Sequence, residues 1–113
     1  MTTFDTGRLA EQAVCRYLET EGFTVVEQNW RTRYCEIDVV AQKDGCIYFV
    51  EVKYRRLSLQ GSGIEYITPK KLRQMTFAAE MWISDHPQTD GYCLAAVGVA
   101  GDNFRVEEFV ELV

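Results

Sequence analysis

The chain has 113 residues, of which 17 are Asp or Glu and 12 are Lys or Arg, and its formal net charge is −5 at pH 7. This length allows one domain and not two, so we expect residues 1–113 to form a single domain. Hydrophobic residues make up 47% of the chain, which is typical of a globular protein rather than a disordered one. The acidic balance argues against a protein that coats nucleic acid with its whole surface, because such proteins usually carry excess Lys and Arg.

The sequence shows neither a membrane span nor a secretion signal. No apolar run approaches the ~18 residues that cross a bilayer, and the first residues lack a basic start and an apolar stretch. We therefore expect a cytoplasmic protein that does not bind membranes. The cysteines form no Cys-x-x-Cys pair and the chain has one histidine, so a zinc site is poorly supported and buried, reduced thiols are expected. They are Cys15, Cys35, Cys46 and Cys93.

The first half of the chain predicts a helix and two strands. Over residues 5–21, Leu9, Ala13 and Tyr17 recur on one helical face, and Gly22 then provides a stop. Residues 23–28 are β-branched and apolar enough for a strand. Residues 34–42 alternate in polarity and predict a second strand. Its two faces would carry Cys35, Ile37 and Val39 on one side and Glu36, Asp38 and Val40 on the other.

The second half predicts three more strands and one helix. Asp44-Gly45 is a strong hairpin signal, so residues 46–54 should return as a strand beside residues 34–42. Thr68-Pro69 predicts the start of a helix that ends before Pro87. Strands follow at 92–99 and 104–110, and loops are expected at 59–63 and 85–91. The order α-β-β-β-α-β-β predicts an α/β fold, a mixed sheet with a helix on each side.

The chemistry-bearing residues lie on the central hairpin. Glu51 and Lys53 are two apart on one strand, so both side chains leave the same face, and the hairpin brings Asp38 close to Glu51. Two such carboxylates repel each other and suit Mg²⁺ or Mn²⁺, which takes hard oxygen ligands. A metal-bound water is a better nucleophile, and the metal offsets charge on a phosphodiester in its transition state. Lys53 would orient the water or stabilise that charge.

A structural interpretation of the same residues stays open. Charged residues on a strand often form an exposed face or an ion pair that contributes little. Here the acid stands between Val50 and Val52 in what looks like a central strand, where uncompensated charge is unfavourable.

Several short segments of the chain resemble those of a known protein family in their residues, order and spacing. They are Gly7-Arg8-Leu9-Ala10-Glu11, Tyr17-Leu18 before Gly22-Phe23, Asn29-Trp30-Arg31, Glu36-Ile37-Asp38-Val39-Val40, Phe49-Val50-Glu51-Val52-Lys53, and Lys71 followed by Ala78-Ala79. Asp38 followed by Glu51-Val52-Lys53 resembles the PD-(D/E)xK nuclease superfamily, which has a three-layer restriction-endonuclease-like fold. More closely, residues 7–83 resemble the YraN-like family of small bacterial proteins.

The resemblance implies roles for particular residues. Asp38, Glu51 and Lys53 would be the metal and catalytic positions of an Mg²⁺- or Mn²⁺-dependent endonuclease. Glu11 would be an additional acid at the metal, or else a solvated helix residue. Glu36 shares a predicted strand face with Asp38 and would either support it or be an exposed neighbour. Similar folds occur in Holliday-junction resolvases, which by analogy indicates branched or damaged DNA as substrate. Many nucleases of this fold work as homodimers.

The chain also departs from the family pattern at two places. Cys35 stands where the family usually has Gly before the Glu-Ile-Asp run, so an added Cβ would have to be accommodated. The start of the strand at 92–99, Tyr92-Cys93-Leu94-Ala95, lacks the Arg-Phe-Asp-like segment that is common in relatives.

The basic residues are concentrated in the middle of the chain. Residues 31–73 contain nine Lys or Arg and five Asp or Glu, whereas the remainder is strongly acidic. Any nucleic acid, DNA above all, should therefore bind this region, with aromatic side chains such as Tyr34, Tyr54 and Tyr66 either stacking on bases or packing in the fold. The candidate phosphate contacts are Arg31, Arg33, Arg55, Arg56, Lys70, Lys71 and Arg73.

Three functions remain open on sequence grounds. The first is a metal-dependent endonuclease. The second is a catalytically silent nucleic-acid-binding domain of the same fold. The third is a protein-interaction domain that docks a partner through its acidic C-terminal segment, which contains Glu107, Glu108 and Glu111.

Overall fold

The helices and strands follow the predicted order. The computed structural model describes residues 2–57 and 66–112, and the loop predicted at 59–63 lies outside them. The elements are α1 (Thr3–Thr20), β1 (Thr24–Arg31), β2 (Glu36–Lys43), β3 (Cys46–Arg55), α2 (Pro69–Ser84), β4 (Tyr92–Ala100) and β5 (Arg105–Glu111). The fold is therefore α/β with the order α-β-β-β-α-β-β, as predicted.

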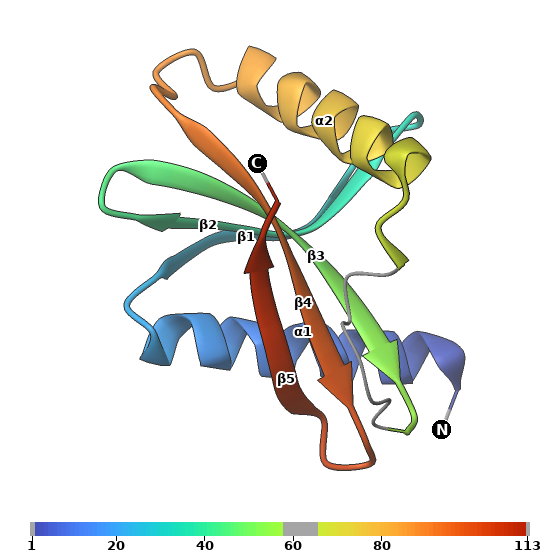
Figure 1. Ribbon diagram of the computed structural model, residues 1–113. Coiled ribbons are helices and arrows are strands. Elements are labelled where there is room, and N and C mark those ends of the chain that lie inside the picture. Colours follow the sequence, from blue (N-terminus) through green and yellow to red (C-terminus); the bar gives the residue numbers. More distant parts are fainter. Residues whose placement is uncertain (1, 58–65, 113) are drawn as a thin grey trace.

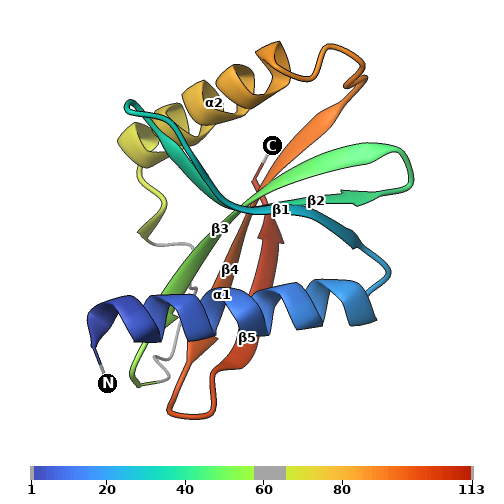
Figure 2. The ribbon, with the colours of Figure 1, turned by 180° about the vertical axis from the view of Figure 1, so that it is seen from behind.

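The five strands form one mixed sheet with the spatial order β1-β2-β3-β4-β5. Strands β3 and β4 are parallel, and the other neighbours are antiparallel. Parallel neighbours need a crossover connection, and the segment that contains α2 supplies it. Helix α1 covers one face of the sheet and α2 the other, which makes three layers (Figure 1; Figure 2).

Both helix starts are set by threonine caps. The Thr2 and Asp5 side chains form a capping box, so α1 begins at Thr3, two residues before the predicted start. The Thr68 hydroxyl accepts a hydrogen bond of 3.0 Å from the backbone N–H of Lys71, and Pro69 occupies the first turn of α2 as predicted.

The β2–β3 hairpin fixes the register at the centre of the sheet. Asp44 and Gly45 both have positive φ, 52° and 79°, which is the conformation that a two-residue hairpin turn requires. Lys43 therefore pairs with Cys46, and the regular ladder continues until Val39 pairs with Val50. The predicted hairpin is confirmed.

Two hydrophobic clusters lie on the two faces of the sheet. Between the sheet and α1, the cluster includes the fully buried Val14, Leu18 and Val97. Between the sheet and α2, Trp82 packs edge-on against Phe49, with ring centroids 5.4 Å apart. Strand β3 is the middle strand of the five, so the segment that carries Glu51 is central, as the sequence indicated.

The predicted alternation of β2 is wrong at one point. Ile37 packs in the α2-side cluster, whereas Val39 packs in the α1-side cluster, so these two side chains do not share a face. The break falls at Asp38, because this side chain hydrogen-bonds the backbone of β3 where the regular β2–β3 ladder has ended. Opposite this point, Asn29 of β1 adopts a positive φ of 51°.

The prediction that the four cysteines are buried is confirmed for two of them and wrong for the other two. Within the described residues none of the four forms a disulfide; Cys15 and Cys93 are buried, and Cys35 and Cys46 are half-buried. No helix in the described part of the chain is long and apolar enough to cross a membrane.

Candidate functional site

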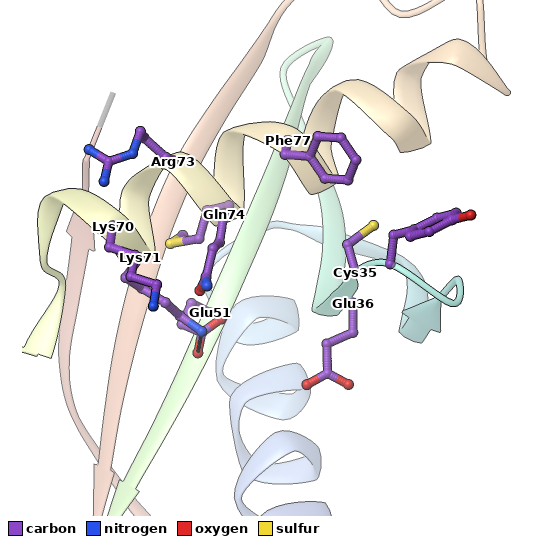
Figure 3. A pocket seen from close by; sticks show the side chains of 10 residues that line it. Cys35, Glu36, Glu51, Lys70, Lys71, Arg73, Gln74 and Phe77 are labelled. Carbon is purple, nitrogen blue, oxygen red and sulfur yellow. Dashed lines mark ion pairs between the residues drawn. The ribbon is translucent and has the colours of Figure 1, made fainter.

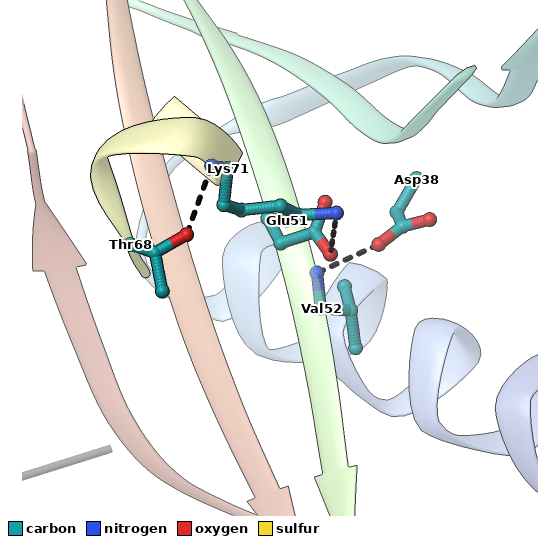
Figure 4. A network of polar contacts seen from close by, with 5 residues as sticks. All are labelled: Asp38, Glu51, Val52, Thr68 and Lys71. Carbon is teal, nitrogen blue, oxygen red and sulfur yellow. Dashed lines mark hydrogen bonds and ion pairs between the residues drawn. The ribbon is translucent and has the colours of Figure 1, made fainter. Parts of the chain in front are cut away.

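Asp38 is held at the fork between β2 and β3. Its Oδ2 accepts a hydrogen bond of 2.8 Å from the backbone N–H of Val52 (Figure 4). Burial and, after it, the neighbouring Glu51 carboxylate raise the pKa of the Asp38 carboxyl to about 7, while the Val52 N–H acts in the opposite direction. An ionised Asp38 is therefore unfavourable here unless a cation accompanies it.

Glu11 of α1 lies on the same side of the site as Asp38. Both line a pocket of about 490 Å³ between α1 and the start of β2, together with Asn29 and Glu36. Burial raises the pKa of the Glu11 carboxyl, and hydrogen bonding with Asn29 and Asp38 partly offsets this. The structure thus brings the predicted additional acid close to Asp38, where it adds to the negative charge.

Glu51 has a cationic partner, and that partner is Lys71 rather than Lys53. Lys71 Nζ lies 3.1 Å from Glu51 Oε2, and the two side chains are only 34% and 21% exposed (Figure 4). Lys53 is exposed, and its Nζ lies 5.8 Å from the centroid of the Tyr66 ring. The first turn of α2 therefore brings Lys71 to the carboxylate that the sequence placed beside Lys53.

Glu36 lies between two pockets. It lines the pocket between α1 and β2 with Asp38, here called the α1-side pocket, and also a second pocket, beside α2, with Glu51. Its side chain is 65% exposed and forms an ion pair of 3.5 Å with Arg31. Glu36 is thus an exposed neighbour of the site, and its charge raises the pKa of Asp38.

Tyr66 also lies at the site, although the sequence indicated it only as an aromatic residue that either stacks on bases or packs in the fold. Its hydroxyl is buried and has no hydrogen-bond partner among the described residues. Burial, followed by the charges of Glu51 and Asp38, raises its pKa, so the hydroxyl stays protonated. Lys53 Nζ and Arg55 Cζ each lie 5.8 Å from its ring centroid. No sequence pattern predicts that the Tyr66 hydroxyl is buried. The residue lies in the connection just before Thr68, the N-cap of α2.

The predicted phosphate contacts are distributed over several places. Lys70, Lys71 and Arg73 line one pocket of about 630 Å³ beside α2, together with Glu51 (Figure 3). The others lie elsewhere: Arg31 in the α1-side pocket, Arg33 against the Tyr34 ring, Arg55 against Tyr66, and Arg56 in a pocket with Tyr54 and Asp102. Three of the seven therefore form one basic patch.

The donor set is compatible with a divalent cation held by few protein ligands. Within residues 2–57 and 66–112, no three His, Cys, Asp or Glu side chains are grouped closely enough to hold a metal by themselves. Mg²⁺ usually keeps several waters and takes one or two carboxylates together with substrate phosphate oxygens. Asp38 and Glu51 fit that pattern, since their mutual repulsion is what a cation would relieve.

Cys35 stands in the short connection between β1 and β2. Thr32 Oγ1 accepts hydrogen bonds from the backbone N–H groups of Tyr34, at 3.0 Å, and Cys35, at 3.2 Å. The φ angle of Cys35 is not in the positive region, so its Cβ is accommodated without the backbone conformation that favours glycine.

The protein is a three-layer α/β sandwich with a half-buried carboxyl at the fork between two strands. The model of the uncharacterised protein family UPF0102 matches residues 10–105. The chain belongs to this family, which confirms the resemblance to YraN-like proteins.

Individual relatives agree with this assignment. The chain is 34% identical over 109 residues to a UPF0102 protein of Helicobacter hepaticus, covering 94% of each chain. It is 36% identical over 104 residues to one of Desulforapulum autotrophicum, covering 89% of this chain and 86% of the relative. It is 40% identical over 87 residues to one of Oleidesulfovibrio alaskensis, of which only 43% is covered. The chain therefore spans less than half the length of that relative.

Proposed function

We propose that the chain is a metal-dependent endonuclease domain that hydrolyses phosphodiester bonds of nucleic acid. The observation that carries this proposal is the half-buried Asp38 carboxyl, which the Val52 N–H holds at the strand fork and whose pKa is raised to about 7 by burial and by the Glu51 carboxylate. A fold that brings carboxylates together at a half-buried position is typical of a site that binds a cation.

Asp38 and Glu51 would hold Mg²⁺ or Mn²⁺, with Glu11, which lines the same pocket as Asp38, as an additional acid. The bound ion would supply an activated water and offset charge on the phosphate. The Val52 N–H fixes the direction of the Asp38 carboxylate. Lys71, which already lies at Glu51, is better placed than Lys53 to stabilise charge that develops on the phosphate.

Cleavage assays with matched variants test the proposal. Wild type, Asp38→Asn, Glu51→Gln and the exposed-acid control Glu36→Gln would be incubated with branched, single-stranded and duplex DNA, with Mg²⁺, Mn²⁺ or EDTA. We expect metal-dependent cleavage that falls at least about 100-fold in the first two variants and remains in the control. Equal cleavage by wild type and Asp38→Asn would overturn the proposal.

A catalytically silent nucleic-acid-binding domain is the second candidate. The observation that favours it is the Lys71–Glu51 ion pair, which already neutralises one of the two proposed metal ligands. Salt-dependent binding of DNA without cleavage under any metal condition would support this candidate over the first.

A further inference from the structure

The pocket beside α2 has two chemically different ends. Figure 3 shows Lys70, Lys71 and Arg73 together with Glu51 at one end, and Phe77 close to Cys35 at the other. The volume of about 630 Å³ lies within the range of pockets that hold small organic molecules. A ligand that fills this pocket should therefore be anionic at one end and flat or apolar at the other.

The basic end is suited to a phosphate group. Lys71 is engaged by Glu51, which leaves the exposed Lys70 and Arg73 as the cations available to a ligand. They project from the first turns of α2, where the positive end of the helix dipole also favours an anion. At the opposite end, the exposed Glu36 carboxylate would repel a phosphate, so the anionic part of a ligand has one preferred position.

The apolar end offers aromatic rings to the solvent. Phe77 is 47% exposed and Tyr34 is 70% exposed, although both are large hydrophobic side chains. The guanidinium of Arg33 lies 5.5 Å from the Tyr34 ring centroid, so this ring also carries a cation. Exposed aromatic rings beside basic side chains are the arrangement on which unpaired nucleic-acid bases stack.

We propose that this pocket binds one unpaired nucleotide of a nucleic-acid strand. The base would lie against Phe77 and Tyr34, and the adjoining phosphate would lie between Lys70 and Arg73, beside Glu51. A fully paired duplex cannot use the aromatic end, because its bases are stacked on each other. The inference deepens the proposed nuclease function and rests on it for the identity of the ligand. It assigns as substrate class a nucleic acid with single-stranded or unpaired nucleotides.

Binding measured without metal tests this assignment separately from cleavage. The full chain in EDTA at low salt would be titrated into a fluorescent single strand of about eight nucleotides and into a blunt duplex of equal length. We expect the single strand to bind roughly 10-fold more tightly, and Phe77→Ala to weaken that binding at least about 5-fold without affecting duplex binding. Lys70→Ala with Arg73→Ala should weaken binding and reduce its salt dependence.

The matched controls are a surface arginine and a conservative ring variant. Arg16, exposed on α1 at the other side of the sheet, should tolerate Arg16→Ala without a change in binding. Phe77→Tyr should retain binding, because it keeps the ring, whereas Phe77→Leu should resemble Phe77→Ala. Far-ultraviolet circular dichroism and thermal melting of each variant would show that differences do not come from unfolding.

The outcomes separate the two proposals. Equal affinity for single strand and duplex, or insensitivity of single-strand binding to Phe77→Ala, would overturn the pocket assignment. Binding of single strands as expected, with no cleavage under any metal condition, would overturn the proposed nuclease function and support the pocket assignment.

Discussion

The backbone N–H of Val52 donates a 2.8 Å hydrogen bond to Oδ2 of Asp38. The acceptor for this N–H of β3 is therefore a side chain of β2 and not a backbone carbonyl of the neighbouring strand. Counted from the hairpin turn, the regular pairing of β2 with β3 ends with Val39 opposite Val50, directly before Asp38 is reached. The acid is therefore held at the point where the two strands separate. This contact lies at the break in alternation along β2 and fixes the position of the Asp38 carboxyl beside β3.

Asp38→Asn should stabilise the metal-free protein, and more so at pH 8 than at pH 5. The pKa of Asp38 rises from an ordinary value of 3.8 to about 7 on folding. The folded protein thus binds more protons than the unfolded chain over this interval, and its stability falls as the pH rises from about 4 to about 7. Asparagine does not ionise, and its side-chain oxygen still accepts from Val52.

Urea unfolding in EDTA at several pH values checks this prediction. Glu36→Gln is the control, because that carboxylate is 65% exposed and should lose little of the wild-type pH profile. Parallel profiles of stability against pH for wild type and Asp38→Asn would contradict a raised pKa of the half-buried Asp38 carboxyl.

Lys71→Met should increase the affinity for Mn²⁺, whereas Lys70→Met should change it less. The Lys71 ammonium lies 3.1 Å from Glu51 and competes with any cation for that carboxylate. Because both side chains are largely shielded from solvent, the charge is only partly screened, and we expect an increase of roughly 5-fold or more. Isothermal titration calorimetry measures it. Weaker Mn²⁺ binding in Lys71→Met would show that the lysine helps to organise the site.

Much of the fold could be predicted because local signals and the global architecture agree. The Asp44-Gly45 turn, the Thr68 cap and the polarity of the strands are all read from neighbouring residues. The break at Asp38 could not be predicted, because the alternation rule assumes an uninterrupted ladder. Only the three-dimensional structure shows that β2 leaves β3 at this residue.

The ion-pair partner of Glu51 could not be predicted from the sequence either. Lys53 is two residues away on the same strand, whereas Lys71 reaches Glu51 only because the crossover returns α2 over this face of the sheet. The buried Tyr66 hydroxyl could not be predicted for the same reason, because whether a hydroxyl has a hydrogen-bond partner depends on residues that are distant in the sequence.

Tyr66→Phe should raise the free energy of unfolding by about 1 kcal/mol, because it removes a buried hydroxyl without a partner among the described residues. Tyr54→Phe is the matched control. The Tyr54 hydroxyl donates a 3.0 Å hydrogen bond to the carbonyl of Gly101, so its removal should lower the free energy by about 1 kcal/mol. Urea unfolding at pH 7 compares the two. Destabilisation by Tyr66→Phe would show that this hydroxyl has a partner in solution.

Thr68→Ala should destabilise the protein by about 1 kcal/mol, while Thr68→Ser should have little effect. The hydroxyl caps α2 by accepting from the backbone N–H of Lys71, the residue whose side chain reaches Glu51. Loss of the cap should therefore also loosen the ion pair. Thr76→Ala is the control, because the Thr76 hydroxyl donates its hydrogen bond to the carbonyl of Leu72 within the helix and does not cap the helix end. Equal destabilisation by Thr68→Ala and Thr76→Ala would exclude a special role for the cap, because the two losses would then be generic for a threonine in α2.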